Sequence, residues 1–317
     1  MPTAGFSRRH WSPALTGKAI HETLTLVESR GGKPKGPEQR GVVIIGPGRL
    51  GQALGRLLAE RGVRIRLVAA RRLAAARSAV RFIGRGKPVA LTNPALADAG
   101  VILITTSDAA IASVAKAVVG LTRDWRGRVV LHTSGALPST LLVSFKRRGA
   151  SVGSLHPFQT IPSPQAGVRN LPGCVWGIEG DAQALRVARR LVRTLGGRSF
   201  RLRPERKILY HAAAFLVCPT VVTLMEHSAR LLRQSGVPAK LADPMLARFV
   251  SETARNFGEL GARRALTGPA VRGDWTTLRR HVVALRRTAP QVVPVYQELV
   301  REMLRLAGRR PPQGLLD

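Results

Sequence analysis

A glycine-rich segment between Gly41 and Gly55 reads GVVIIGPGRLGQALG. The four apolar residues Val42 to Ile45 lead into a glycine-rich turn, and a helical pattern of apolar residues follows. The turn contains G-x-G-x-x-G at Gly46, Gly48 and Gly51, between a strand and a helix, as in dinucleotide-binding sites. Glycine turns also join strands to helices without binding a ligand, so the rest of the sequence has to decide.

Each glycine of this turn has its own expected role. Gly46 permits the tight turn, Gly48 lets a pyrophosphate approach the backbone, and Gly51 lets the helix pack closely on the strand. The helix N-terminus adds free N–H groups and a partial positive charge for the phosphates. We therefore predict that a dinucleotide is bound by Gly46, Pro47, Gly48, Arg49, Leu50 and Gly51.

The composition is that of a globular protein with room for two cores. The chain has 317 residues, 44% of them hydrophobic, and a mean hydropathy of +0.01. We saw no apolar run near the ~20 residues that span a bilayer, which predicts no membrane partner. The two cysteines and the lack of a signal peptide favour a cytoplasmic protein, and no His or Cys spacing indicates a metal site.

The net charge of +33 raises the possibility of nucleic-acid binding. The charges are spread along the whole chain, most of them are arginine, and only 4% of the residues are aromatic, so stacking platforms are scarce. We therefore expect arginine-rich solvated surfaces and no specific nucleic-acid partner.

Apolar runs alternate with helical patterns from Gly41 onward, which predicts an α/β fold with a parallel sheet covered on both faces. After Pro204 only helical patterns follow, interrupted at LTGPAVRGD, where Asp274 is a good N-cap. Residues 1–39 lack an apolar period. We predict a flexible extension (1–39), a Rossmann domain (40–203) and an all-α domain for substrate and dimerisation (204–317). The expected strands are 42–45, 64–68, 101–105, 128–132, 151–155, 174–179 and 198–202, and the expected helices include 205–235, 239–260, 275–287 and 290–308.

The second expected strand predicts NADP(H) as the cofactor. NAD sites place an acid about 20 residues after the turn, yet no Asp or Glu occurs between Glu60 and Asp98. Arg71 and Arg72 stand where the 2′-phosphate would bind, and a guanidinium pairs with phosphate bidentately. Because arginine is abundant throughout this chain, the missing acid is the stronger argument.

Polar residues follow three of the expected strands and open on the same edge of the sheet, where ligands bind in open α/β folds. Thr105, Thr106 and Ser107 are predicted to line the cofactor site, with Ser107 or Asp108 as an alternative helix cap. The residues predicted to line the substrate site are His132, Ser134 and His156, although each could be purely structural.

The first helix after Pro204 carries the candidate catalytic residues. Lys207 and His211 are four residues apart and share one helical face, and Cys218 points in nearly the same direction. Arg272, in the interrupting loop, is a candidate for holding a substrate carboxylate. The alternatives are an exposed lysine, an interface histidine and an ordinary turn.

Several motifs together resemble a known group of proteins. GPGRLG, TTSDAAI, VVLHTSGAL, SLHPFQT, KILYHAAAFLV and TGPAVRGD occur in the order seen in Rossmann-like oxidoreductases with a helical C-terminal domain of unknown function. These resemble the superfamily of 6-phosphogluconate dehydrogenase, ketopantoate reductase and pyrroline-5-carboxylate reductase. The resemblance covers residues 41 to about 300. It implies an NADP-linked reductase, often a homodimer through the helical domain.

The resemblance also bears on catalysis. Ketopantoate reductases use a lysine on the corresponding helix as the acid for the carbonyl, and Lys207 matches by type. Relatives commonly have an asparagine eight residues after the position of His211, where this chain has Pro219. We therefore expect an NADPH-dependent reductase of a small 2-oxo acid, preferably ketopantoate-like, or of an imine. The alternative is a non-catalytic NADP-binding sensor or scaffold.

Overall fold

The computed structural model of the protein describes residues 36–314. Most of the expected extension therefore lies outside the described residues. Its last part does not, because Pro37–Arg40 form the 3₁₀ turn η1. A Cβ added to Gly100 would collide with the backbone of Pro37. Pro37–Arg40, most of which we had placed in the extension, therefore pack against the folded body.

An eight-stranded sheet forms the first part of the protein, with the strand order β3-β2-β1-β4-β5-β6-β7-β8. The Rossmann-type α/β fold predicted from the sequence is confirmed. The strands are β1 (Val42–Ile45), β2 (Ile65–Ala70), β3 (Lys87–Ala90), β4 (Val101–Ile104), β5 (Val129–His132), β6 (Ser151–Pro157), β7 (Val175–Gly180) and β8 (Arg198–Arg201).

Two features of the sheet differ from the sequence prediction. Strand β7 pairs antiparallel to β6, with Pro157 opposite Trp176, so the connection between them starts and ends at the same edge. Strand β8 is parallel to β7, and the six strands from β3 to β6 are parallel to one another. The edge strand β3 was not predicted, because its residues are half exposed and lack the apolar run of a central strand.

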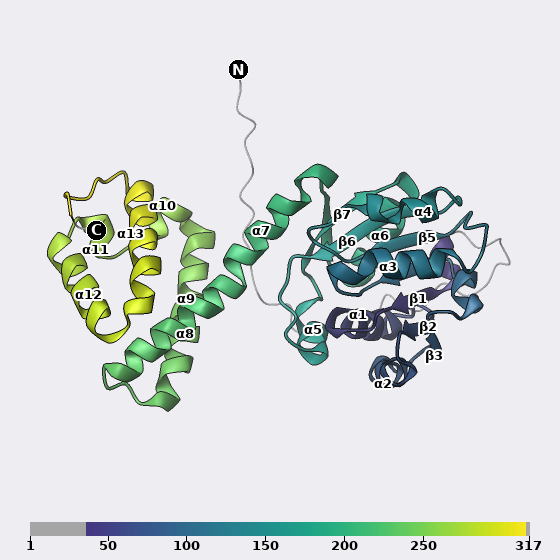
Figure 1. The fold of residues 1–317 in the computed structure, drawn as a ribbon, viewed down its shortest axis with the longest axis horizontal. Helices are drawn as coiled ribbons and strands as arrows, with labels where there is room; N and C mark the ends of the chain where they lie inside the picture. The colour runs from purple at the N-terminus through teal and green to yellow at the C-terminus, as the bar shows by residue number, and fades with distance from the viewer. Residues whose placement is uncertain (1–35, 315–317) are drawn as a thin grey trace, which may run out of the picture.

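Helices cover both faces of the sheet because the strand side chains alternate between them (Figure 1). Val42 and Ile44 lie in the core beneath α1 and α6, whereas Val43 and Ile45 lie in the core beneath α3. The elements between the strands are α1 (Arg49–Glu60), α2 (Leu73–Ile83), η2 (Pro94–Asp98), α3 (Asp108–Val119), η3 (Ser139–Leu142), α4 (Val143–Lys146), α5 (Pro164–Asn170) and α6 (Ala182–Thr194).

Every element described after Arg201 is helical. The expected helix 205–235 is divided at Cys218, because Pro219 begins a new helix. Asp274 caps α12 as predicted, since its carboxylate accepts from Thr277 N–H at 3.0 Å. These elements are η4 (Pro204–Arg206), α7 (Lys207–Val217), α8 (Pro219–Gln234), α9 (Ala239–Leu260), α10 (Ala262–Ala265), α11 (Pro269–Arg272), α12 (Trp275–Thr288), η5 (Pro290–Val292) and α13 (Val293–Ala307).

The helical part extends away from the sheet, and α7 and α8 form the diagonal that joins the two (Figure 1). The stretch Pro204–Gln234 is long and apolar enough to cross a membrane by length and composition, with a mean hydropathy of 1.9 and 0% of its apolar window buried. Our sequence statement that no apolar run approaches that length was therefore wrong. Length and composition alone are weak evidence for a membrane span.

Candidate cofactor and substrate site

A cavity of about 400 Å³ opens at the carboxyl ends of β1, β2 and β4. Its wall contains eight of the predicted cofactor residues, which are Gly46, Pro47, Gly48, Arg71, Arg72, Thr105, Thr106 and Ser107. The predicted residues Arg49, Leu50 and Gly51 are not in the wall. Sequence reasoning did not select the remaining wall residues Ile45, Ala70, Ala75, Leu91, Ala110, Ser113 and Val114.

The glycine turn has the shape that a dinucleotide needs. Gly46 has a φ of +78°, and a Cβ there would meet the side chain of Thr106. A Cβ on Gly48 would meet nothing within 4 Å, so a ligand has open access to this backbone. Thr105 fixes the turn by donating its hydroxyl to the carbonyl of Gly46 at 2.8 Å. A Cβ on Gly51 would collide with that same hydroxyl, so glycine is required there for close packing.

The chemistry of this wall fits a phosphorylated dinucleotide. The buried hydroxyl of Thr106 has no hydrogen-bond partner among the described residues, which leaves it for a ligand. Helix α1 begins directly behind the turn and has no side-chain cap. Arg71 and Arg72 are exposed in the wall, and no acidic residue belongs to it. These groups would hold the pyrophosphate and the 2′-phosphate of NADP(H).

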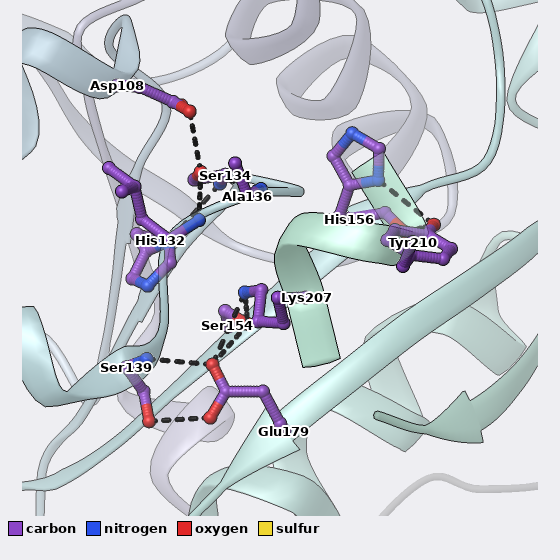
Figure 2. A network of polar contacts seen from close by, with 11 residues as sticks. Asp108, His132, Ser134, Ala136, Ser139, Ser154, His156, Glu179, Lys207 and Tyr210 are labelled. Carbon is purple, nitrogen blue, oxygen red and sulfur yellow. Dashed lines mark hydrogen bonds and ion pairs between the residues drawn. The ribbon is translucent and has the colours of Figure 1, made fainter. Parts of the chain in front are cut away.

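The loop after β5 is held beside Asp108 by a hydrogen bond of Ser134 (Figure 2). Ser134 donates its hydroxyl to Asp108 at 2.8 Å, and its N–H donates to Nδ1 of His132 at 3.1 Å. His132 is fully buried, and burial lowers its pKa to about 4, with a further lowering from the Lys207 charge. His132 and Ser134 therefore shape the loop, and neither is in the wall of a described cavity.

His156 is held by Tyr210, a residue that sequence reasoning missed. The two side chains meet at 3.0 Å between Nδ1 and the phenol oxygen (Figure 2). Burial raises the pKa of Tyr210 to about 12, so its phenol stays protonated and can donate. Burial, followed by the nearby His211, lowers the pKa of His156 to about 4. His156 is thus a neutral imidazole near pH 7, and its Nε2 lies so close to Gly135 that a Cβ there would be 2.8 Å away.

A second cavity of about 540 Å³ lies between the end of β6 and the helices α7 and α8. His156 and His211 both line it, and their ring centroids are 6.3 Å apart. The rest of the wall is formed by Phe158, Gln159, Thr160, Ala214, Phe215, Val217, Cys218, Pro219, Val221 and Val222. This wall is mainly apolar and contains no lysine or arginine.

The other two predicted site residues lie elsewhere. Lys207, which we expected to face the crevice, is 0% exposed and contacts Ser154 and Glu179 beneath the histidines (Figure 2). Arg272 ends α11, at the opposite end of the molecule from the sheet (Figure 1). Of the predicted catalytic and substrate residues, this chain therefore brings His156 and His211 together in one cavity and leaves Arg272 away from it.

Comparison with known proteins finds two family models that match successive parts of the chain. Residues 33–157 match the family model described as a Rossmann-like domain, and residues 174–303 match a domain of unknown function, DUF2520. The second match begins before β7, earlier than the domain boundary that we predicted at residue 204. No curated protein that was compared with the sequence matches it.

Three solved structures illustrate the structural likeness. A candidate NADP oxidoreductase from Bacteroides fragilis is 25% identical, with a TM-score of 0.69 over 84% of this chain and 98% of that one. An imine reductase from Aspergillus terreus in complex with NADPH4 and dibenz[c,e]azepine is 19% identical, with a TM-score of 0.59 over 87% and 98%. A pyrroline-5-carboxylate reductase from Coxiella burnetii is 17% identical, with a TM-score of 0.54 over 84% and 98%.

The fold, the glycine turn and the arginine-lined cavity define the class of this protein, an NADP-linked oxidoreductase. Within that class, the sheet part of the chain is similar to the Rossmann-like model and the stretch from β7 onward is similar to the DUF2520 model.

Proposed function

We propose that the protein is an NADPH-dependent reductase of a small-molecule imine. The observation that carries the proposal is the second cavity, where two histidines face apolar residues at the same sheet edge as the cofactor cavity. The loop after β5 lies between the two, because β5 is placed between β4 and β6. A substrate in the second cavity would therefore lie beside the end of the cofactor site.

The lining of this cavity favours an imine with apolar substituents over a 2-oxo acid. A carboxylate that leaves water needs a cationic partner, and the cavity wall contains no lysine or arginine. Arg272, the group that we expected to hold a carboxylate, ends α11, which lies at the opposite end of the chain from the sheet (Figure 1). The ketopantoate-like reaction that we first preferred is therefore the less favoured alternative.

The residues of this chain would manage the proton. NADPH, when bound, supplies the hydride to the substrate carbon, and the electron pair of the double bond then passes to nitrogen, which takes a proton. His211 lies in the cavity wall and is the favoured donor of that proton. His156, neutral and fixed by Tyr210, would offer its Nε2–H to orient the substrate.

A non-catalytic NADP-binding protein is the alternative that a specific residue favours. Pro219 occupies the cavity wall where, by the resemblance described above, relatives commonly have asparagine. Proline offers neither a side-chain donor nor a backbone N–H to a substrate. The two histidines are the groups that would have to compensate for it.

We also propose that two copies of the chain associate through an apolar face on α7, α8 and α9. Phe215 and Phe249 are 59% and 72% exposed, and Phe257, Leu216 and Val222 are exposed with them. Helices of a soluble protein ordinarily bury such residues. A second copy would offer the same apolar residues in return, as an isologous interface requires.

A membrane is the other occupant to consider for this face. The face is spread over three helices, and α8 also carries Glu226, Arg230 and Arg233 among its apolar residues. Charged side chains of this kind are costly inside a bilayer but are common at subunit edges. A second copy of the chain therefore fits this face better than a membrane does. If the purified protein floated with lipid vesicles in a density gradient, the dimer assignment of this face would be contradicted.

The proposed activity is tested with a panel of substrates. Purified protein is mixed with NADPH and with cyclic imines, preformed acyclic imines or 2-oxo acids, and the absorbance of NADPH is followed at 340 nm. We expect turnover of apolar imines and little turnover of 2-oxo acids. Turnover of 2-oxo acids alone would contradict the imine assignment, and NADPH binding without turnover of any substrate would favour the sensor alternative.

A further inference from the structure

A buried ion pair joins the start of the helical part to the sheet. The ammonium of Lys207 lies 2.6 Å from the hydroxyl of Ser154 on β6 and 3.3 Å from Oε1 of Glu179 on β7. Lys207, Glu179 and Ser154 are each 0 or 1% exposed (Figure 2). Lys207 is also the first residue of α7, so the pair fixes the point where this helix leaves the sheet.

The carboxylate of Glu179 accepts from four groups, three of them at Oε1 and one at Oε2. Ser139 donates its N–H to Oε1 at 2.8 Å and its hydroxyl to Oε2 at 2.7 Å. Ser154 accepts from Lys207 and donates to Oε1 at 2.8 Å. Burial opposes ionisation of Glu179, but these donors and the Lys207 charge outweigh it and lower the pKa of the carboxyl. Burial also lowers the pKa of Lys207, an effect that the neighbouring Glu179 charge opposes, so each group of the pair depends on the other for its charge.

The ion pair controls the next turn of α7. Tyr210 and His211 lie three and four residues after Lys207, on the same side of the helix. Tyr210 reaches His156 on β6, and His211 faces His156 across the second cavity. The position of His211 relative to the sheet is thus set by two polar anchors of α7, Lys207 and Tyr210.

We infer that Lys207 is a positioning residue, whose buried ion pair with Glu179 fixes α7 on the sheet and holds His211 opposite His156. Its ammonium is not in the cavity wall, and Ser154 and Glu179 already engage it. This replaces our sequence-based expectation that Lys207 donates the proton. The kinetic part of the inference rests on the proposed reductase function, whereas the structural part does not.

Three variants of the full chain test the inference. Lys207→Met leaves the buried Glu179 carboxylate without a counter-ion, although Ser139 and Ser154 still donate to it, whereas Lys207→Met with Glu179→Leu replaces both charges by apolar groups. Lys146→Met is the matched control, because the Lys146–Asp181 pair is 2.5 Å long but its lysine side chain is 57% exposed. Urea unfolding of the full chain and amide hydrogen exchange of its residues 207–217 are measured first, since neither measurement needs a substrate.

We expect Lys207→Met to raise the unfolding constant roughly 10²-fold or more and to speed exchange in α7, because breaking one side of a buried pair strands a charge. The double variant should recover both to within about tenfold, because apolar replacement of a buried pair is often neutral. Lys146→Met should change the unfolding constant and the exchange rate of α7 by less than about fivefold each. A Lys207→Met protein with native stability and native exchange would overturn the inference.

Kinetics then separate positioning from proton donation. We expect the kcat of the double variant to lie within about tenfold of the native value, with a raised KM. The alkaline limb of its plot of kcat against pH should stay where it is in the native protein. Loss of the proton donor would instead lower kcat by roughly 10²–10⁴ at unchanged KM. That result, in a double variant with native exchange, would overturn the inference. If the native protein reduces no substrate, the proposed function fails, and the unfolding and exchange results still decide whether the ion pair fixes α7.

Discussion

The sheet part and the helical part of this protein have similarly apolar sequences but bury their apolar residues very differently. In the sheet part, β1 and β4 are completely buried, and α1 and α6 each bury one full face. In the helical part, the longest helix, α9, buries only Ala242, and α8 buries only Ala229. The two cores described within α11–α13 are small.

This difference indicates where each part finds its packing partner. Strands and helices of the sheet part complete one another within the chain, as α/β units generally do. The exposed phenylalanines of α7–α9 would each gain about 1.5–3 kcal/mol from burial, and nothing described in this chain covers them. The comparison therefore predicts that the helical part, unlike the sheet part, depends on a second copy.

The largest effect is expected from charged substitutions in the apolar face of α7–α9. Phe215→Asp combined with Phe249→Asp should weaken dimerisation at least ~10³-fold, because central aromatic residues at interfaces contribute about 2–4 kcal/mol each. Sedimentation equilibrium measures the dissociation constant. Val143→Asp is the control, since Val143 is 44% exposed on the sheet part. A double variant that remains a native dimer would show that this face is not the interface.

The next effect concerns the cavity where the two parts meet. His211→Ala should lower kcat by roughly 10²–10⁴, the range for loss of a general acid, while the NADPH dissociation constant stays within a few-fold. Steady-state kinetics and an NADPH titration measure the two quantities. His281→Ala removes an imidazole from α12, where it contacts Tyr296, and serves as the control. If the His211→Ala variant kept the native kcat, another group would have to donate the proton.

A third effect should be confined to the sheet part. His132 and His156 both have a pKa of about 4, below the ordinary value of 6.5, because burial disfavours the imidazolium. The unfolded chain thus binds more protons between pH 6.5 and 4, so stability is full above 6.5 and falls as the pH drops to 4. Each histidine contributes about 3 kcal/mol to this loss.

Urea unfolding at several pH values measures this loss. The variants His132→Gln and His156→Gln should each flatten the dependence on pH, relative to a His281→Gln control in the helical part. A native pH profile without any slope between 6.5 and 4 would contradict the assignment of neutral, buried histidines.

The smallest effect sharpens the cofactor assignment. NADPH should bind at least tenfold more tightly than NADH, which corresponds to about 1.4 kcal/mol, and Arg71→Ala with Arg72→Ala should abolish the preference. Arg77→Ala with Arg81→Ala removes the same charge from exposed positions on α2 outside the cavity and should preserve it. Calorimetric titration of both cofactors measures the effect. Equal affinity for NADH and NADPH in the native protein would contradict the role of the arginine pair.

Much of the sheet part could be predicted from the sequence because its signals are local. The run from Val42 to Ile45 and the glycines after it predict a strand, a turn and a helix within fifteen residues. The cofactor cavity lies at this turn, as the glycine pattern predicted. The edge strand β3 was missed because it carries no continuous apolar run. The antiparallel direction of β7 could not be predicted, since an apolar run is the same whichever way its strand points.

The candidate site was only partly predictable because it is assembled from distant residues. His156 and His211 were selected from strand ends and helix spacing, and they do share a cavity. Tyr210 was missed although it lies beside His211, because its role depends on reaching a residue 54 positions away. The signal for Glu179 was a single carboxyl in the otherwise apolar strand CVWGIEG, and its partners could not be named from the sequence.

From the sequence alone we predicted the alternation of strands and helices, the glycine turn and a preference for a 2′-phosphate, and the structure confirms the first two. These follow from periodicity, backbone freedom and the absence of an acid, which are properties of neighbouring residues. The buried ion pair of Lys207, the distance of Arg272 from the sheet and the exposed apolar face of α7–α9 became visible only once the chain was folded. The burial of a side chain depends on which remote residues surround it, and no local pattern specifies them.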